Sequence, residues 1–123
     1  MADPVDRTHL ERLATRFGAH FLVQLIDVFI AQGRDRMAAA ERGVANGDAA
    51  AIIGAAHALS SSAGNLGAPA LRKCAADIER RGNAGASIEM LAPMVLALGE
   101  QFAAACSALE ATRADVARRT ARA

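Results

Sequence analysis

The stretch that decides the fold is residues 46–69, NGDAAAIIGAAHALSSSAGNLGAP. Its apolar residues recur at alternating intervals of four and three, which is the spacing of one buried stripe along an α-helix. These residues are Ile52, Ala56, Leu59, Ala63 and Leu66. Asn-Gly is a turn dipeptide, Asp48 is a good N-cap, and Gly67 with Pro69 can end one helix and start the next. The stretch therefore predicts a helix over about residues 49–66 between two tight turns.

Four further stretches show helical periodicity, and only short loops separate them. We expect helices over about residues 6–16, 18 or 19–44, 70–81 and 88–118. Pro93 lies close enough to the start of the last helix to be tolerated there or to kink it. Short loops between long amphipathic helices give antiparallel neighbours. The predicted fold is all-α, an antiparallel up-and-down four-helix bundle. Its core spans about residues 18–112, with a short N-terminal cap helix and a basic tail over 113–123 that frays at its end.

Length and composition bound the possible functions. A chain of 123 residues without an internal repeat is one domain, and its 53% hydrophobic and 3% aromatic content favours close-packed helices. The net charge of +1 and the absence of Tyr and Trp argue against nucleic-acid binding. No run of 18 apolar residues and no signal peptide is present, so we expect a cytoplasmic protein without membrane insertion. Cys74 and Cys106 lack a CxxC partner and are expected to be reduced.

His57 is the candidate functional residue of the helix over 49–66. At roughly 100° per residue it points about 140° away from the apolar stripe, so we expect it to face solvent. Its helical neighbours Gly54, Ser61 and Gly64 are all small, and Ile53 precedes them on the same side. An exposed imidazole on a helix surface without large side chains is open to a partner protein. We therefore predict a docking surface around His57.

The turns predict which residues lie beside His57. Reversal near residues 67–68 places His57 level with about Ile78 or Glu79, and reversal near residues 46–47 places it level with about Arg36. A carboxylate that accepts from one ring nitrogen fixes the tautomer and leaves the other nitrogen nucleophilic. The alternative for both Glu79 and Arg36 is an ordinary solvated helix flank.

Several chemistries lack the residues that they need. Serines follow His57, but no carboxylate lies three or four residues from it and there is no nucleophile elbow. His9, His20 and His57 do not have metal-ligand spacing, and no glycine-rich phosphate loop is present. A solvent-facing histidine can instead carry a phosphoryl group, with a docking partner supplying Mg²⁺. We expect the domain itself to bind no cofactor.

The residues around His57 resemble the histidine-containing phosphotransfer (HPt) domain of bacterial phosphorelays. The similar segments are residues 56–68, AHALSSSAGNLGA, followed by Leu71, Cys74, Ile78 and Glu79, and the preceding residues 29–55. The resemblance covers roughly residues 20–110. It implies a phosphocarrier rather than an enzyme, in which His57 accepts a phosphoryl group from a receiver-domain aspartate and passes it to another receiver. It also implies that Glu79 holds the position beside the imidazole.

The chain departs from the HPt pattern at two positions. The family usually has lysine three residues after the histidine and glycine four after it, where this chain has Ser60 and Ser61. Either Arg36 or Arg34 supplies the missing cation, with Arg36 and Ser60 as candidate phosphate contacts, or transfer is slower. The rival interpretation is a pseudo-HPt domain that docks a receiver or an enzyme without relaying phosphate.

The start of the chain, MADP, resembles a cut end, so we expect the domain to be the terminal module of a hybrid sensor kinase. Kinase activity would then reside elsewhere in that longer chain, and this domain could be the cytoplasmic part of a membrane-bound sensor. As an isolated domain, we expect a monomer.

Overall fold

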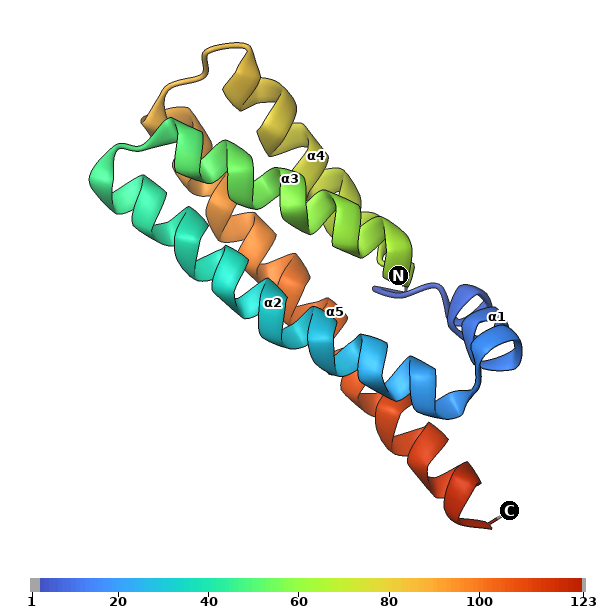
Figure 1. Ribbon diagram of the computed structural model, residues 1–123. Coiled ribbons are helices and arrows are strands. Elements are labelled where there is room, and N and C mark those ends of the chain that lie inside the picture. Colours follow the sequence, from blue (N-terminus) through green and yellow to red (C-terminus); the bar gives the residue numbers. More distant parts are fainter. Residues whose placement is uncertain (1–2, 123) are drawn as a thin grey trace.

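Turn residues divide the chain into helices at the positions that the sequence indicates. The computed structural model describes residues 3–122, which form α1 (Arg7–Phe17), α2 (Ala19–Asn46), α3 (Ala49–Leu66), α4 (Pro69–Asn83) and α5 (Ile88–Arg122) (Figure 1). The Asp48 side chain accepts from the Ala51 N–H at 3.1 Å, which caps α3 as predicted. Gly67 adopts a φ of +84° and donates its N–H to the Ala63 carbonyl, and Pro69 opens α4. Pro93 lies inside α5, which continues through it.

Helices α2 to α5 form an antiparallel bundle. Each helix packs on two neighbours, so that α3 lies between α2 and α4 while α5 closes the ring between α4 and α2 (Figure 1). The predicted all-α bundle is confirmed. The arrangement leaves one face of α3 turned outward, between the flanks that contact α2 and α4.

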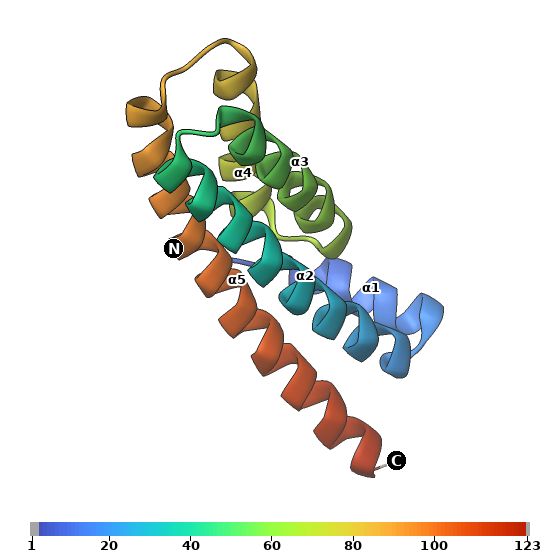
Figure 2. The same cartoon turned by 60° about the vertical axis from the view of Figure 1, so that its left-hand side comes forward.

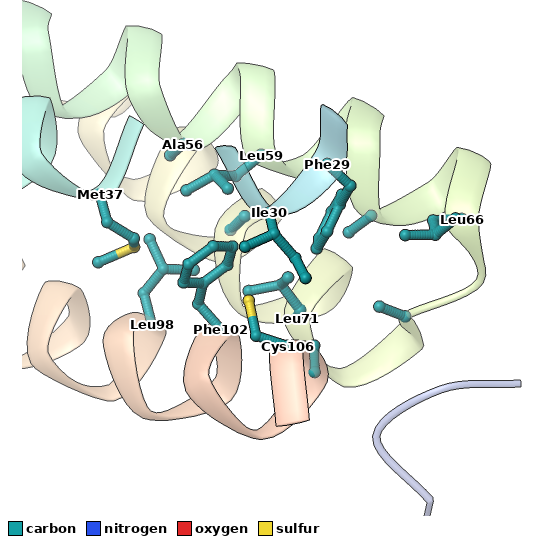
Figure 3. Close-up of a cluster of buried hydrophobic side chains, with 14 of the residues drawn as sticks. Phe29, Ile30, Met37, Ala56, Leu59, Leu66, Leu71, Leu98, Phe102 and Cys106 are labelled. Atoms are coloured by element: carbon teal, nitrogen blue, oxygen red, sulfur yellow. The ribbon is translucent and has the colours of Figure 1, made fainter. Parts of the chain in front are cut away.

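The bundle encloses one apolar core. Phe29, Met37, Leu59, Leu98 and Phe102 meet in its centre, where the rings of Phe29 and Phe102 are 5.9 Å apart (Figure 3). Within the part of the chain that the structure describes, no polar or charged side chain is buried. The bundle is therefore held by apolar packing, and polar chemistry is confined to its surface.

The N-terminal segment closes one end of the bundle. Val5 and Leu10 are each only 1% exposed, so this segment adds to the core rather than lying loosely on it. The Asp6 N–H donates to the Gly67 carbonyl at 2.7 Å, and His9 Nε2 lies 2.8 Å from the Asn65 carbonyl. These bonds satisfy carbonyl groups at the end of α3 that would otherwise lack helical partners. The predicted cap helix is confirmed as α1.

Helix α5 continues to Arg122, beyond the predicted helix end near residue 118, so the predicted fraying at the end of the tail is wrong as far as that residue. The last turns of α5 project past the bundle (Figure 2). Arg113 donates to both carboxylate oxygens of Asp27 on α2, at 2.8 and 3.3 Å, which ties the projecting helix to its neighbour. Ion pairs of Asp115 with Arg118 and Arg119 connect successive turns and favour the helix further.

Helix α5 is also long and apolar enough to cross a membrane by length and composition. One side of it faces the bundle, where Leu91, Leu98 and Leu109 are completely buried, while Met90 and Leu96 are exposed. A core helix of a four-helix bundle has these properties, since it must bury a continuous apolar stripe.

Candidate functional site

His57 lies on the outward face of α3. Its side chain is 67% exposed, whereas its sequence neighbour Ala56 and the next stripe residue, Leu59, are buried. The orientation follows from helical geometry, because a residue rotated by about 140° from the buried stripe must point away from the core. The predicted exposure of His57 is confirmed.

Glu79 is the hydrogen-bond partner of His57. Although 22 residues separate them, His57 Nδ1 lies 2.6 Å from Glu79 Oε2, and the Glu79 side chain is 28% exposed. The tight turn between α3 and α4 brings the two residues level, as the sequence predicts. An ionised carboxylate can only accept a hydrogen bond, so a neutral imidazole in this contact carries its proton on Nδ1 and keeps the lone pair of Nε2.

Two glycines allow α3 and α4 to approach closely on either side of this pair. A β-carbon at Gly82 of α4 would lie 2.5 Å from Ile53 Cγ1 on α3, which is too close for any real contact. Towards the other end, the Arg72 side chain of α4 lies across Gly64 of α3, with its Cδ and Nε 3.3 Å from the position of a β-carbon. The flank of α3 that carries His57 is thus packed against α4.

The surface around His57 has room for a partner. Gly54, Ser61 and Gly64 are exposed, while Ile53 and Ser60 are half-buried. A β-carbon at Gly54 would meet no other atom within 4 Å, so the α3 backbone is open to close approach there. From Ala49 to Leu66, α3 carries no Asp, Glu, Lys or Arg. His57 is the titratable side chain of this helix.

The structure does not join Arg36 to His57. Arg36 is exposed on α2, and within residues 3–122 no hydrogen bond or ion pair connects the two side chains. His57 bonds to α4, whereas α2 packs on the other side of α3 (Figure 1). A phosphate contact by Arg36 stays a prediction. The same holds for Ser60, whose hydroxyl has no hydrogen-bond partner among the described residues.

Comparisons with known proteins agree with this site. The family model described as the Hpt domain matches residues 24–116, which is more than half of the chain. The chain belongs to the Hpt domain family. Its fold is similar to the crystal structure of histidine-containing phosphotransfer protein B (HptB) from Pseudomonas aeruginosa PAO1. The TM-score is 0.81 at 21% identity, over 94% of this chain and 98% of that one. No curated protein matches the chain in sequence.

Membership of the family establishes the class of function. Hpt domains are phosphocarriers of two-component phosphorelays rather than catalytic enzymes, and they interact with receiver domains. The match begins at residue 24, so α1 lies outside it. Sequence reasoning did not single out Arg72 or Gly82. The sequence does indicate the position of Arg72, because it lies seven residues, or about two helical turns, before Glu79 and therefore on the same side of α4 as Glu79.

Proposed function

We propose that His57 carries the phosphoryl group in this Hpt domain, accepting it from a receiver-domain aspartate and passing it to a second receiver. The supporting observation is the 2.6 Å contact between His57 Nδ1 and Glu79 Oε2 on an imidazole that is mostly exposed. The contact orients the ring and holds the proton on Nδ1, so Nε2 is the nucleophile.

The transfer step follows from this arrangement. The Nε2 lone pair attacks the phosphorus of the receiver's aspartyl phosphate, a P–N bond forms, the P–O bond to the aspartate breaks, and the aspartate leaves as a carboxylate. The imidazole ring becomes positively charged while Nδ1 keeps its proton, and the Glu79 carboxylate stabilises that charge. Transfer to the second receiver reverses these bond changes. The receiver supplies Mg²⁺, which neutralises charge on the transferring group.

The position of Ser60 favours a second candidate function. Hpt domains usually have lysine here, and Ser60 is half-buried and uncharged, so the phosphorylated form lacks one source of stabilisation. A domain that docks a receiver without relaying phosphate would share the fold and the docking surface. Cytoplasmic location, a monomeric state and a place at the end of a hybrid sensor kinase remain predictions within either function.

Phosphotransfer from radiolabelled receivers tests the proposal. Purified receiver domains are charged with labelled acetyl phosphate and mixed with the wild-type domain, His57→Gln and His20→Gln, the last of which removes another exposed imidazole. We expect alkali-stable, acid-labile label on the wild type and on His20→Gln, and none on His57→Gln. Label that persists in His57→Gln contradicts the assignment of His57. Receiver binding without label on the wild type supports the docking-only function instead.

A further inference from the structure

Arg72 is a cation without a partner at the edge of the His57 surface. Its Cδ and Nε lie beside Gly64 of α3, 3.3 Å from the position of a β-carbon there, and the residue is exposed. Within residues 3–122 its guanidinium makes no ion pair or hydrogen bond, whereas Arg80 on the same helix pairs with Asp77 at 2.9 Å. A hollow beside Arg72 also reaches Asp6, but that carboxylate accepts from the His9 N–H and caps α1.

Arg72 shares a flank of α4 with Glu79. Seven residues separate them, which is two helical turns and a rotation of only about 20°. The other α4 cations, Lys73, Arg80 and Arg81, are rotated by about 100–200° from Glu79 and point elsewhere. Arg72 is therefore the α4 cation that lies on the flank packed against α3.

A protein docked on His57 would cover Arg72. Gly64, on which Arg72 rests, lies about 10 Å from His57 along the α3 axis. A standard interface buries about 800 Å² on each partner, a patch with a radius of about 16 Å. Since α3 itself carries no Asp, Glu, Lys or Arg, Arg72 is a prominent charge within that radius.

The geometry separates Arg72 from the phosphoryl group. Helical side chains lean towards the N-terminus of their own helix. Because α4 is antiparallel to α3, this lean carries Arg72 away from His57, and His57 leans away from Gly64 in turn. An exposed guanidinium whose Nε lies beside α3 and that pairs with no carboxylate within residues 3–122 is instead available for a bidentate contact with an acidic side chain.

Resting on the proposed function, we propose that Arg72 is a specificity residue that binds a carboxylate of the docked receiver. Arg72 lies beside Gly64, which is about two helical turns from His57 along α3. The domain therefore prefers receivers that have an acidic side chain at a matching distance from the phosphorylated aspartate. Arg72 acts on encounter and affinity and takes no part in the chemical step.

The test compares Arg72→Ala with Arg81→Ala, which removes the same charge from another flank of α4. With the purified receiver domain that transfers fastest, we expect Arg72→Ala to lower kcat/KM about tenfold at low ionic strength, because KM rises. The difference should shrink to about twofold near 0.5 M salt, where the Debye length is only a few ångströms. For Arg81→Ala, kcat/KM should stay at the wild-type value. For Arg72→Ala, the single-turnover rate at saturating receiver should also stay at the wild-type value. Labelling of His57 by phosphoramidate, which needs no receiver, should be equal in all three proteins.

A charge swap identifies the contact. Arg72→Glu should transfer more slowly than Arg72→Ala, and reversal of one acidic side chain of the receiver to arginine should restore it. If Arg72→Ala equals the wild type at low salt, or lowers the saturated single-turnover rate without changing KM, this proposal is overturned while the phosphocarrier function stands. If no acid reversal restores Arg72→Glu, the carboxylate contact is excluded. A wild-type domain that no receiver or phosphoramidate can label overturns both proposals.

Discussion

Gly82→Ala should destabilise the protein, even though alanine is the better helix former. The new β-carbon would lie 2.5 Å from Ile53 Cγ1 and 2.9 Å from Ile53 Cδ1, whereas ordinary contacts are 3.4–4 Å. Either the side chain or the helix must therefore move by about 1 Å, and overpacking of this kind costs about 1–3 kcal/mol. The gain in helix propensity offsets at most about 1 kcal/mol, and less so near the end of α4. We expect a net loss of about 1 kcal/mol in the free energy of unfolding.

A double-mutant cycle with Ile53→Ala isolates this clash. When the Ile53 carbons that meet the new β-carbon are removed, Gly82→Ala should become neutral or stabilising, which gives a coupling of about 1 kcal/mol. Urea denaturation followed by circular dichroism measures all four proteins. Gly54→Ala is the matched control, because its β-carbon meets nothing within 4 Å and it should stabilise by about 0.5–1 kcal/mol. The close approach of Gly82 to Ile53 is refuted if Gly82→Ala is more stable than the wild type. It is also refuted if the effects of Gly82→Ala and Ile53→Ala on the free energy of unfolding are additive.

The same variant connects stability to function. Gly82 lies three residues after Glu79 on the same side of α4, so a displaced α4 should lengthen the 2.6 Å contact to His57. We expect Gly82→Ala to slow loading of His57 and the Ile53→Ala double variant to recover part of the rate.

Three further predictions address single residues. Glu79→Gln keeps a hydrogen-bond acceptor for His57 but loses the negative charge, so phosphoryl transfer from the receiver to His57 should be about tenfold slower. An unchanged rate would exclude electrostatic stabilisation by Glu79. Burial raises the pKa of the Cys106 thiol from 9.0 to about 11, so folding favours the protonated form. The buried thiol therefore contributes fully to the free energy of unfolding below pH 9, and this contribution is lost as the pH rises through 11. Urea denaturation of Cys106→Ala should not show this loss of stability at high pH. Gly67→Ala should cost at least about 1 kcal/mol more than Gly47→Ala in thermal denaturation. Both glycines have positive φ, but only at Gly67 does a β-carbon meet a histidine ring, at 2.7 Å. Equal costs would contradict that contact.

The sequence was sufficient to predict the helices and to place His57 level with Ile78 or Glu79, for physical reasons. Helical periodicity fixes which side of α3 is buried, and a tight turn at Gly67 fixes the register of α4 against α3. Once both are known, the residue opposite His57 must be close to Glu79. The prediction thus needed only helical geometry and one turn position.

Contacts that depend on side-chain packing could not be predicted in this way. The close approach of Gly82 to Ile53 and the position of Arg72 over Gly64 require the distance between helix axes and individual rotamers. The bond from His9 to the Asn65 carbonyl spans 56 residues and joins a segment whose periodicity says nothing about where it docks. The pair of Arg113 with Asp27 likewise joins two helices across 86 residues, which helical periodicity alone does not predict.

The lack of charged side chains along α3 bears on the timing of the relay. A helix surface of alanine, glycine and serine offers few large anchors, so a receiver seated on it gains little binding energy from any single residue of α3. With association at about 10⁶ M⁻¹s⁻¹ and micromolar affinity, a complex lasts about one second. If His57 carries the phosphoryl group as proposed, a short residence time frees it between donor and acceptor. A phosphocarrier that must bind two receivers in succession transfers more phosphoryl groups per unit time when each receiver binds weakly. Tighter binding would make dissociation of the receiver the rate-limiting step.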